Sequence, residues 1–122
     1  MRIMLYPITP VPKPRQTQAD KWRQRPSVMR YREFADRCRL LGVTIREGGD
    51  RITFLMPMPR SWSKKAREQM RGKPHQQRPD VDNLAKALLD AVFPEDCRVW
   101  DSRMTKIWAD EGGIRIEPIP HP

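Results

Sequence analysis

The sequence has no long hydrophobic run, which argues against a protein that crosses a membrane as helices. No segment approaches the roughly 18 to 20 consecutive apolar residues that a transmembrane helix needs. Residues 1–7 contain one basic residue and an apolar run that ends at Pro7, so this stretch is too short for a signal peptide. We therefore expect a cytoplasmic protein.

Cysteine and histidine are also scarce. Cys38 and Cys97 provide neither a disulfide framework nor a C-x-x-C spacing, and we expect both to be small buried side chains in a reducing compartment. His75 and His121 do not lie at the spacing of paired metal ligands. The sequence thus argues against a zinc site.

What the chain has in excess is positive charge. Its 24 Lys and Arg residues face 15 Asp and Glu residues, for a formal net charge of +9 and a pI near 10.3. Such an excess favours a polyanionic partner, and no basic helix here has a wholly apolar face that would suit a membrane surface. We expect a nucleic-acid-binding protein.

The length of 122 residues fits one domain, which we place at residues 1–122. A chain of this size buries only about two-thirds of its unfolded surface, so pairing two copies would enlarge the core. A homodimer is the expectation.

Residues 9–26 form a proline-rich basic arm. The segment contains four prolines, five Lys or Arg residues and Trp22, which is typical of a stiff extended segment. Two interpretations stay open: an arm that follows phosphates and stacks Trp22 on a base, or a solvated loop that Trp22 pins to the core. The basic and aromatic residues that we predict to contact DNA are Lys13, Arg15, Lys21, Trp22, Lys64, Lys65, Lys73 and Arg78.

Hydrophobic periodicity predicts an α+β domain with a mixed sheet and helices packed on one face. We expect strands at 2–8 and 50–58 and an antiparallel pair at 98–109 and 114–117, whose turn has glycines with positive φ. We expect a helix from Ser27, as N-cap, to about residue 41, with Gly42 as its stop. A short helix capped by Ser61 or Ser63 should end at Gly72, and a helix of about a dozen residues should end at Phe93.

That last helix opens with the one dense acidic motif of this basic chain. Asp80 and Asp82 lie two residues apart, Lys86 follows Asp82 by four, and Glu95 and Asp96 come just after the helix. An aspartate at a helix start can simply cap it, contributing about 0.5–2 kcal/mol with no further role. Capping explains Asp80 but not the number of acids.

Three carboxylates brought within about 5 Å repel one another unless a proton or a cation lies between them. At neutral pH a divalent cation is the better solution, and an all-oxygen donor set suits Mg²⁺. Lys86 could hold a phosphate oxygen or the attacking water, or could form an exposed ion pair worth at most about 1 kcal/mol.

At these residues the sequence resembles the RusA-like Holliday junction resolvases, Mg²⁺-dependent endonucleases of bacteria and their phages. The resemblance rests on Asp80-Val81-Asp82-Asn83-Leu84-Ala85-Lys86, on the following 87–91 and on Glu95-Asp96-Cys97-Arg98-Val99. It implies that Asp80, Asp82 and Asp96 bind metal and are catalytic, and that Lys86 is the catalytic lysine. It also implies homodimers that act on four-way junctions, and a bacterial or phage-encoded source.

The sequence departs from the family pattern in two places. The segment between the helix and the acidic pair is short, which makes Asp101 a competitor for the third metal position. Glu95 stands where the family often has aspartate, so it is a second candidate near the metal.

We therefore predict a Mg²⁺-dependent endodeoxyribonuclease that resolves Holliday junctions in recombination and repair, with Mn²⁺ able to substitute. The alternatives are a nuclease selective for flaps or forks and a non-catalytic DNA-binding module. No small-molecule cofactor is expected.

Overall fold

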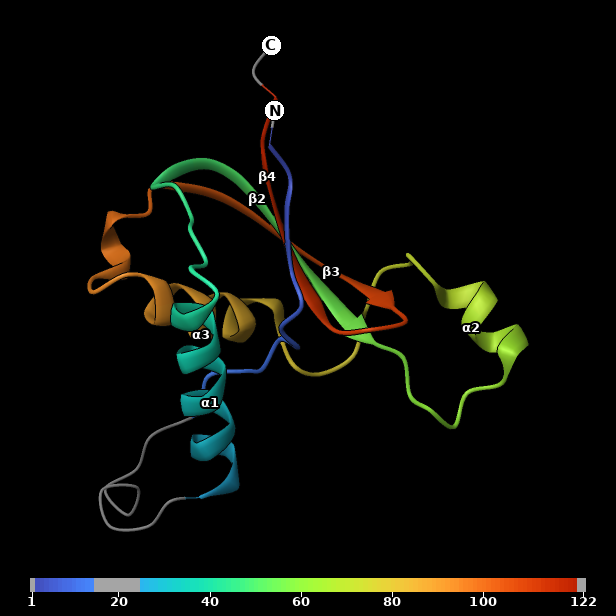
Figure 1. Ribbon diagram of the computed structural model, residues 1–122. Coiled ribbons are helices and arrows are strands. Elements are labelled where there is room, and N and C mark those ends of the chain that lie inside the picture. The colour runs from blue at the N-terminus through green and yellow to red at the C-terminus, as the bar shows by residue number, and fades with distance from the viewer. Residues whose placement is uncertain (1, 15–24, 121–122) are drawn as a thin grey trace.

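The computed structural model describes residues 2–14 and 25–120, which form a small α+β domain (Figure 1). Its principal helices and strands follow one another along the chain as β1 Met4–Tyr6, α1 Pro26–Leu40, β2 Gly48–Pro57, α2 Lys64–Met70, α3 Val81–Val92, β3 Asp101–Ala109 and β4 Gly113–Pro118, with a short 3-10 helix, η2, at Asp96–Arg98. None of the helices in the described part of the chain is both long and apolar enough to cross a membrane.

The four strands form one mixed sheet in the order β1-β4-β2-β3. β2 pairs in parallel with β3, with Met56 opposite Trp108, and antiparallel with β4, with Phe54 opposite Ile114. The expected antiparallel pair of 98–109 and 114–117 is therefore wrong, because β2 lies between the two strands. The helical connection after β2 returns the chain to the end where β2 began, so the next strand runs parallel to it.

Gly112 and Gly113 lie where the chain passes from β3 to β4, and their lack of a side chain matters there. A Cβ on Gly112 would lie 2.4 Å from Oγ1 and 2.8 Å from Cα of Thr9, and one on Gly113 would lie 3.2 Å from Cδ1 of Leu55. Neither glycine has the positive φ that the turn prediction assumed. The glycines are needed because a side chain here would collide with the segment after β1, which includes Thr9.

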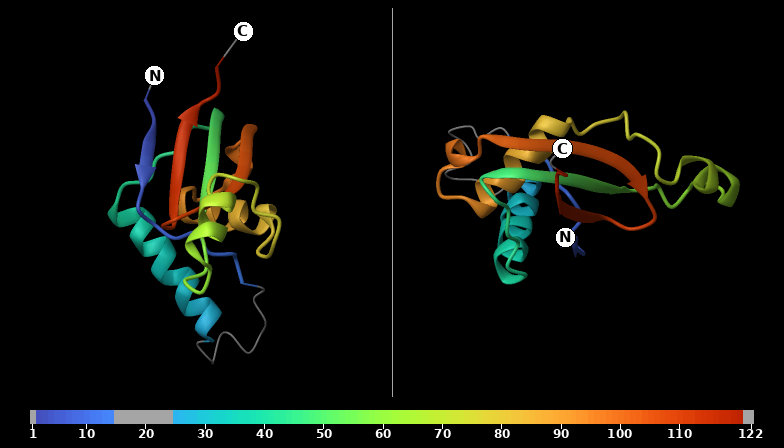
Figure 2. Two further views of the ribbon diagram at one scale, coloured as in Figure 1. Left: turned by 90° about the vertical axis from the view of Figure 1, so that its right-hand side faces the viewer. Right: turned by 90° about the horizontal axis from the view of Figure 1, so that it is seen from above.

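One apolar core joins the sheet to α1 and α3, which lie on the same side of it (Figures 1 and 2). Ile52, Phe54 and Met56 alternate along β2 toward this core, as the period-two pattern predicted. α3 adds a stripe at helical spacing, and α2 stands apart with no buried residue. The core residues from the two helices are Val28, Phe34, Ala35, Cys38, Leu84, Ala87, Leu88 and Ala91.

The helix ends follow local chemistry, with one correction. α1 starts with Arg25 at its N-cap position and Pro26 in its first turn, so Ser27 is not the cap. Proline favours the first helical position because its missing N–H would be unpaired there anyway. The predicted stops are confirmed: Gly42 and Gly72 have φ of 64° and 79°.

The two cysteines differ in environment. Cys38 is buried on α1, and that burial raises the pKa of its thiol to about 11. Cys97 lies exposed in η2, so the expectation that both cysteines are buried is wrong for this one. Cys97 follows Asp96 in η2, at the surface, and belongs to neither of the core-facing stripes of α1 and α3.

Gly112→Ala should lower the free energy of unfolding by about 1–3 kcal/mol, because the added methyl meets the backbone of Thr9 and one of the two segments must shift. Chemical denaturation followed by circular dichroism measures this. Glu111→Ala, at the exposed neighbouring position, is the control and should change stability by no more than about 0.5 kcal/mol. Equal midpoints for the two variants would contradict the packing described here.

Candidate active site at the start of helix α3

Asp80 occupies the N-cap position of α3 without capping it. Its backbone is extended, with φ −67° and ψ 146°, yet its side chain makes no capping hydrogen bond. Ser63 shows the contrast, because its hydroxyl accepts a 3.1 Å hydrogen bond from the amide of Ala66 at the start of α2. Asp80 and Asp82 are both exposed, so capping alone does not account for the acidic helix start.

A groove of about 600 Å³ opens beside Asp80. Two basic residues and one acidic residue line it, and its walls come from the base of the arm, the loop before α3 and the start of α3. The amide of Lys13 donates a 3.3 Å hydrogen bond to the carbonyl of Asn83, so the arm runs across the start of the helix. The lining residues are Pro12, Lys13, Arg78, Pro79, Asp80 and Asn83.

The loop before α3 is fastened to β3. The ammonium of Lys106 donates a 2.6 Å hydrogen bond to the carbonyl of Pro79 and another to that of Gln77, and the amide of His75 donates to the carbonyl of Lys106 at 3.0 Å. His75 packs against Trp108 with 4.2 Å between ring centroids. Burial, followed by the charge of Lys106, lowers the pKa of His75, so it acts as a neutral packing residue that helps place Asp80.

Lys86 lies between two carboxylates. Its Nζ is 2.8 Å from Oδ2 of Asp96 and 3.7 Å from Oδ1 of Asp90. The hydrogen bond from Lys86 lowers the pKa of Asp96, and the bond to Asp96 with the nearby charge of Asp90 raises the pKa of Lys86. At neutral pH the structure thus holds Asp96 ionised and Lys86 protonated, with η2 drawn onto the polar face of α3.

Asp90 also binds the arm. Lys13 forms an ion pair with Asp90, and its Nζ lies 5.1 Å from the centroid of the Tyr31 ring. About a quarter of the Lys13 side chain is exposed. The predicted DNA contact by Lys13 therefore has to be made by a lysine that already has a partner, and Asp90 joins the arm, α3 and Lys86.

The carboxylates have the donor chemistry of a Mg²⁺ site but not its assembled form. Within residues 2–14 and 25–120, no three His, Cys, Asp or Glu side chains are grouped closely enough to hold a metal ion. Asp96 instead faces the ammonium of Lys86. The expected convergence of Asp80, Asp82 and Asp96 is therefore not seen among the described residues, and the ion-pair partner of Asp96 there is Lys86.

The other two acidic candidates lie on either side of η2. Glu95 is exposed immediately before it, and Asp101 begins β3, half-buried opposite Gly48 of β2. Neither forms an ion pair in the described part of the chain that would match the bond between Asp96 and Lys86. Of the three, Asp96 is the acid that the structure connects to the predicted catalytic lysine.

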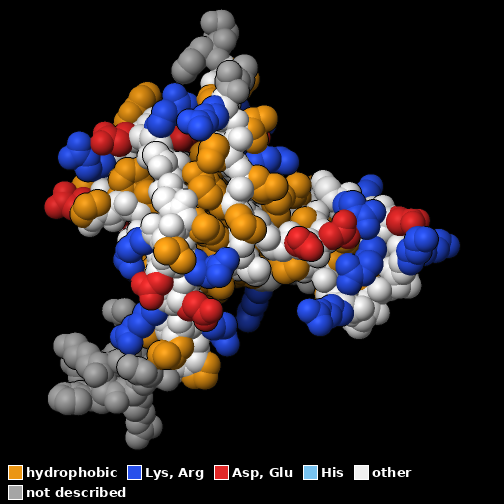
Figure 3. Space-filling view, in the orientation of Figure 1, with side chains coloured by type: hydrophobic (Ala, Val, Ile, Leu, Met, Phe, Trp, Pro, Cys, Tyr) orange, Lys and Arg blue, Asp and Glu red, His pale blue; other side chains and the backbone are white. Residues whose placement is uncertain are grey.

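The predicted DNA-binding residues divide into three groups. Arg15, Lys21 and Trp22 lie outside the described residues. Lys64 and Lys65 are exposed on α2, where Figure 3 shows basic side chains gathered at one end of the molecule, and Lys73 and Arg78 are exposed on the path from α2 to the groove. These last four could bind phosphates without breaking a packed contact.

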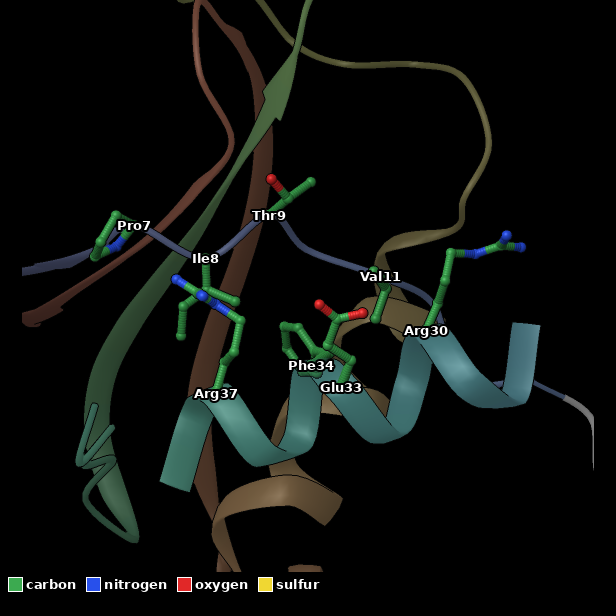
Figure 4. A pocket seen from close by; sticks show the side chains of 8 residues that line it. All are labelled: Pro7, Ile8, Thr9, Val11, Arg30, Glu33, Phe34 and Arg37. Atoms are coloured by element: carbon green, nitrogen blue, oxygen red, sulfur yellow. The ribbon is translucent and has the colours of Figure 1, made fainter. Parts of the chain in front are cut away.

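A second cavity, of about 460 Å³, lies away from the acidic motif between the segment after β1 and helix α1 (Figure 4). Arg30, Glu33 and Arg37 rise toward it from α1, and Phe34 forms part of its floor. None of the acids of the motif lines it, and its own Glu33 offsets the two arginines. We do not assign the candidate site to this cavity.

Sequence reasoning missed Asp90 and Lys106 as residues that build the site. The signal for Asp90 was its four-residue spacing from Lys86, which places the two side chains on one helix face. Lys106 left no such signal in the sequence. It fastens the loop before α3, and that loop lies beside β3 only in the folded structure.

The fold and this surface define a small α+β protein whose acidic helix start borders a groove that Lys13 and Arg78 also line. The model of the endodeoxyribonuclease RusA family matches residues 7–117, most of the chain, and the protein belongs to that family. A search of curated proteins found no match.

Asp90→Asn should release Lys13, whose ion pair is with Asp90, while Lys86 keeps its 2.8 Å bond to Asp96. We expect Lys13 to acylate several-fold faster than in the wild type, and Lys86 to change less, when peptides are quantified by mass spectrometry. Asp36→Asn is the matched control, since it removes the same charge from an exposed pair with Arg39 on α1. Unchanged reactivity of Lys13 in Asp90→Asn would show that Asp90 does not hold it.

Proposed function

We propose that the protein resolves Holliday junctions, or closely related branched DNA, by hydrolysing phosphodiester bonds during recombination and repair. Membership of an endodeoxyribonuclease family supports the chemistry. One observation carries the assignment to this surface: Asp80 is exposed and its side chain makes no capping hydrogen bond. Asp80 lies close in sequence to Asp82 and lines a groove together with Arg78 and Lys13. Backbone phosphates fit the basic groups, and the acids are available for hydrolysis.

In the proposed reaction a water oxygen forms a bond to phosphorus as the bond from phosphorus to the 3′ oxygen breaks, leaving a 5′-phosphate and a 3′-hydroxyl. Lys86, one turn after Asp82 on α3, is suited to stabilise the negative charge that grows on the phosphate oxygens. Asp96 and Asp90 keep it protonated and oriented for that role.

We also propose dependence on Mg²⁺, replaceable by Mn²⁺, with Asp80, Asp82 and Asp96 as ligands. When bound, the ion would supply positive charge and lower the pKa of a coordinated water. A cation at Asp96 has to compete with the Lys86 ammonium for the same oxygen atoms, because Lys86 lies 2.8 Å from Oδ2.

A homodimer completes the proposal, with one site per subunit for paired cuts. The outer side of β1 has no partner strand within the described residues; Leu5 of β1 is 61% exposed, and Ile3, just before the strand, is 59% exposed. Apolar side chains on an unpaired edge strand suit pairing with a second copy.

Asp82→Asn should abolish cleavage of a four-way junction while leaving binding equal or tighter, because removing a negative charge beside phosphates lessens repulsion. Cleavage gels and gel-shift titrations at fixed Mg²⁺ measure both. Asp36→Asn again removes one charge, away from the motif, and should cut like the wild type.

The same gels separate the alternatives. Preferential cleavage of flaps or forks would replace the junction assignment with that of a flap- or fork-selective nuclease. Junction binding without cleavage by the wild type would leave a DNA-binding module, and equal cutting of linear duplex would contradict any selectivity for branched DNA.

Lys86→Met should abolish cleavage yet bind Mn²⁺ several-fold more tightly than the wild type, because the competing ammonium is gone. Isothermal titration calorimetry without DNA measures the affinity. Lys65→Met, an exposed lysine on α2, is the control for lost positive charge. Equal Mn²⁺ affinity in Lys86→Met and Lys65→Met would remove Asp96 from the proposed ligand set.

A further inference from the structure

Trp100 is a large aromatic side chain that the fold leaves in water. It is 79% exposed, whereas Trp108 is only 4% exposed and Trp62 packs against Trp108 with 4.8 Å between ring centroids. A tryptophan brings one of the largest apolar surfaces of any residue, so leaving it exposed forgoes a substantial burial gain.

The indole of Trp100 is nevertheless held in place. A Cβ on Gly48 would lie 2.4 Å from Cε2 and 2.6 Å from Nε1 of Trp100, which means that the ring rests directly on the Gly48 backbone. The amide of Trp100 donates a 2.9 Å hydrogen bond to the carbonyl of Glu47, and Arg98 forms a 3.1 Å ion pair with the Glu47 carboxylate. An aromatic ring supported in this way loses little conformational entropy when something stacks on it.

The surroundings of Trp100 suit a nucleic acid. Arg98, two residues earlier, is exposed and paired with Glu47, and Arg46 lies beside Gly49, paired with Asp50 and with about half of its side chain exposed. Asp96, which contacts Lys86, begins η2 four residues before Trp100. A base on the indole would thus lie near two exposed, ion-paired arginines, on the segment that also carries the acid bound to Lys86.

We propose that Trp100 is a stacking platform for an unpaired or unstacked nucleobase at the branch point of the DNA. This inference rests on the proposed function and adds a reason for selectivity, because a base in continuous duplex is already stacked on its neighbours. Every base offers a π face, so such a contact tolerates any sequence, and stacking on an aromatic side chain contributes about 1–3 kcal/mol per base.

The test uses a four-way junction with 2-aminopurine at the branch point, titrated with protein in EDTA so that divalent-metal-dependent cleavage is suppressed. Stacking of 2-aminopurine on the indole should quench its fluorescence in the wild type. Trp100→Ala should abolish the quenching and weaken junction binding by about 5- to 100-fold. Trp100→Phe should retain most of both, while a linear duplex should show no dependence on residue 100.

Two further variants guard against indirect effects. Gly48→Ala keeps the indole but pushes it off its support, so quenching should fall although every aromatic residue is present. Leu40→Ala removes an apolar side chain that is 83% exposed on α1 and should leave quenching unchanged. Circular dichroism checks that each variant is folded, and a misfolded Trp100→Ala leaves Trp100→Phe and Gly48→Ala to decide.

The outcomes separate this inference from the proposed function. Wild-type protein that quenches the probe but never cuts DNA would refute the nuclease and keep the stacking site. Cleavage that is normal, with quenching identical in the wild type, Trp100→Ala and Gly48→Ala, would refute the stacking site alone. A dimer that becomes a monomer in Trp100→Ala, measured by light scattering, would mean that a second copy covers the indole, which also overturns the inference.

Discussion

The packing of helix α3 is the constraint on which the rest of this molecule depends. Leu84, Ala87, Leu88 and Ala91 bury one side of the helix in the core that α1 and the sheet share. Because the helix can bury only that stripe, its opposite side must carry Asp82, Lys86 and Asp90 toward the surface. Displacing α3 would therefore move the acids, the lysine and the base of the arm together.

Several of the positive charges of this protein are held in specific contacts with other parts of the chain. A net charge of +9 attracts phosphate, yet Lys13, Lys86 and Lys106 are already engaged with Asp90, Asp96 and two backbone carbonyls. These lysines position the arm, the polar face of α3 and the loop before it. Lys64, Lys65, Lys73 and Arg78 are exposed, and in the proposed function they attract the substrate electrostatically, which needs no fixed geometry.

Local patterns were sufficient for the helices and for most strands. The four-residue spacing on α3, the serine before α2 and the glycines after α1 and α2 all act through neighbours in sequence, so they could be interpreted without a fold. The pairing of the last two strands was wrong because proximity along the chain favoured a hairpin. In the fold, the helical connection after β2 places β3 alongside β2, and β4 pairs with the other edge of β2.

The sequence by itself determined the α+β class, the acidic start of α3 and the basic character of the surface, because these depend on periodicity, spacing and composition. The tertiary structure alone decided that Lys86 meets Asp96, that Asp90 joins the arm to α3, and that Trp100 lies open on Gly48. Each of these contacts joins segments that are separate in the sequence, and the local pattern of one segment says nothing about the position of the other. Their distances are set only when the core brings the segments together.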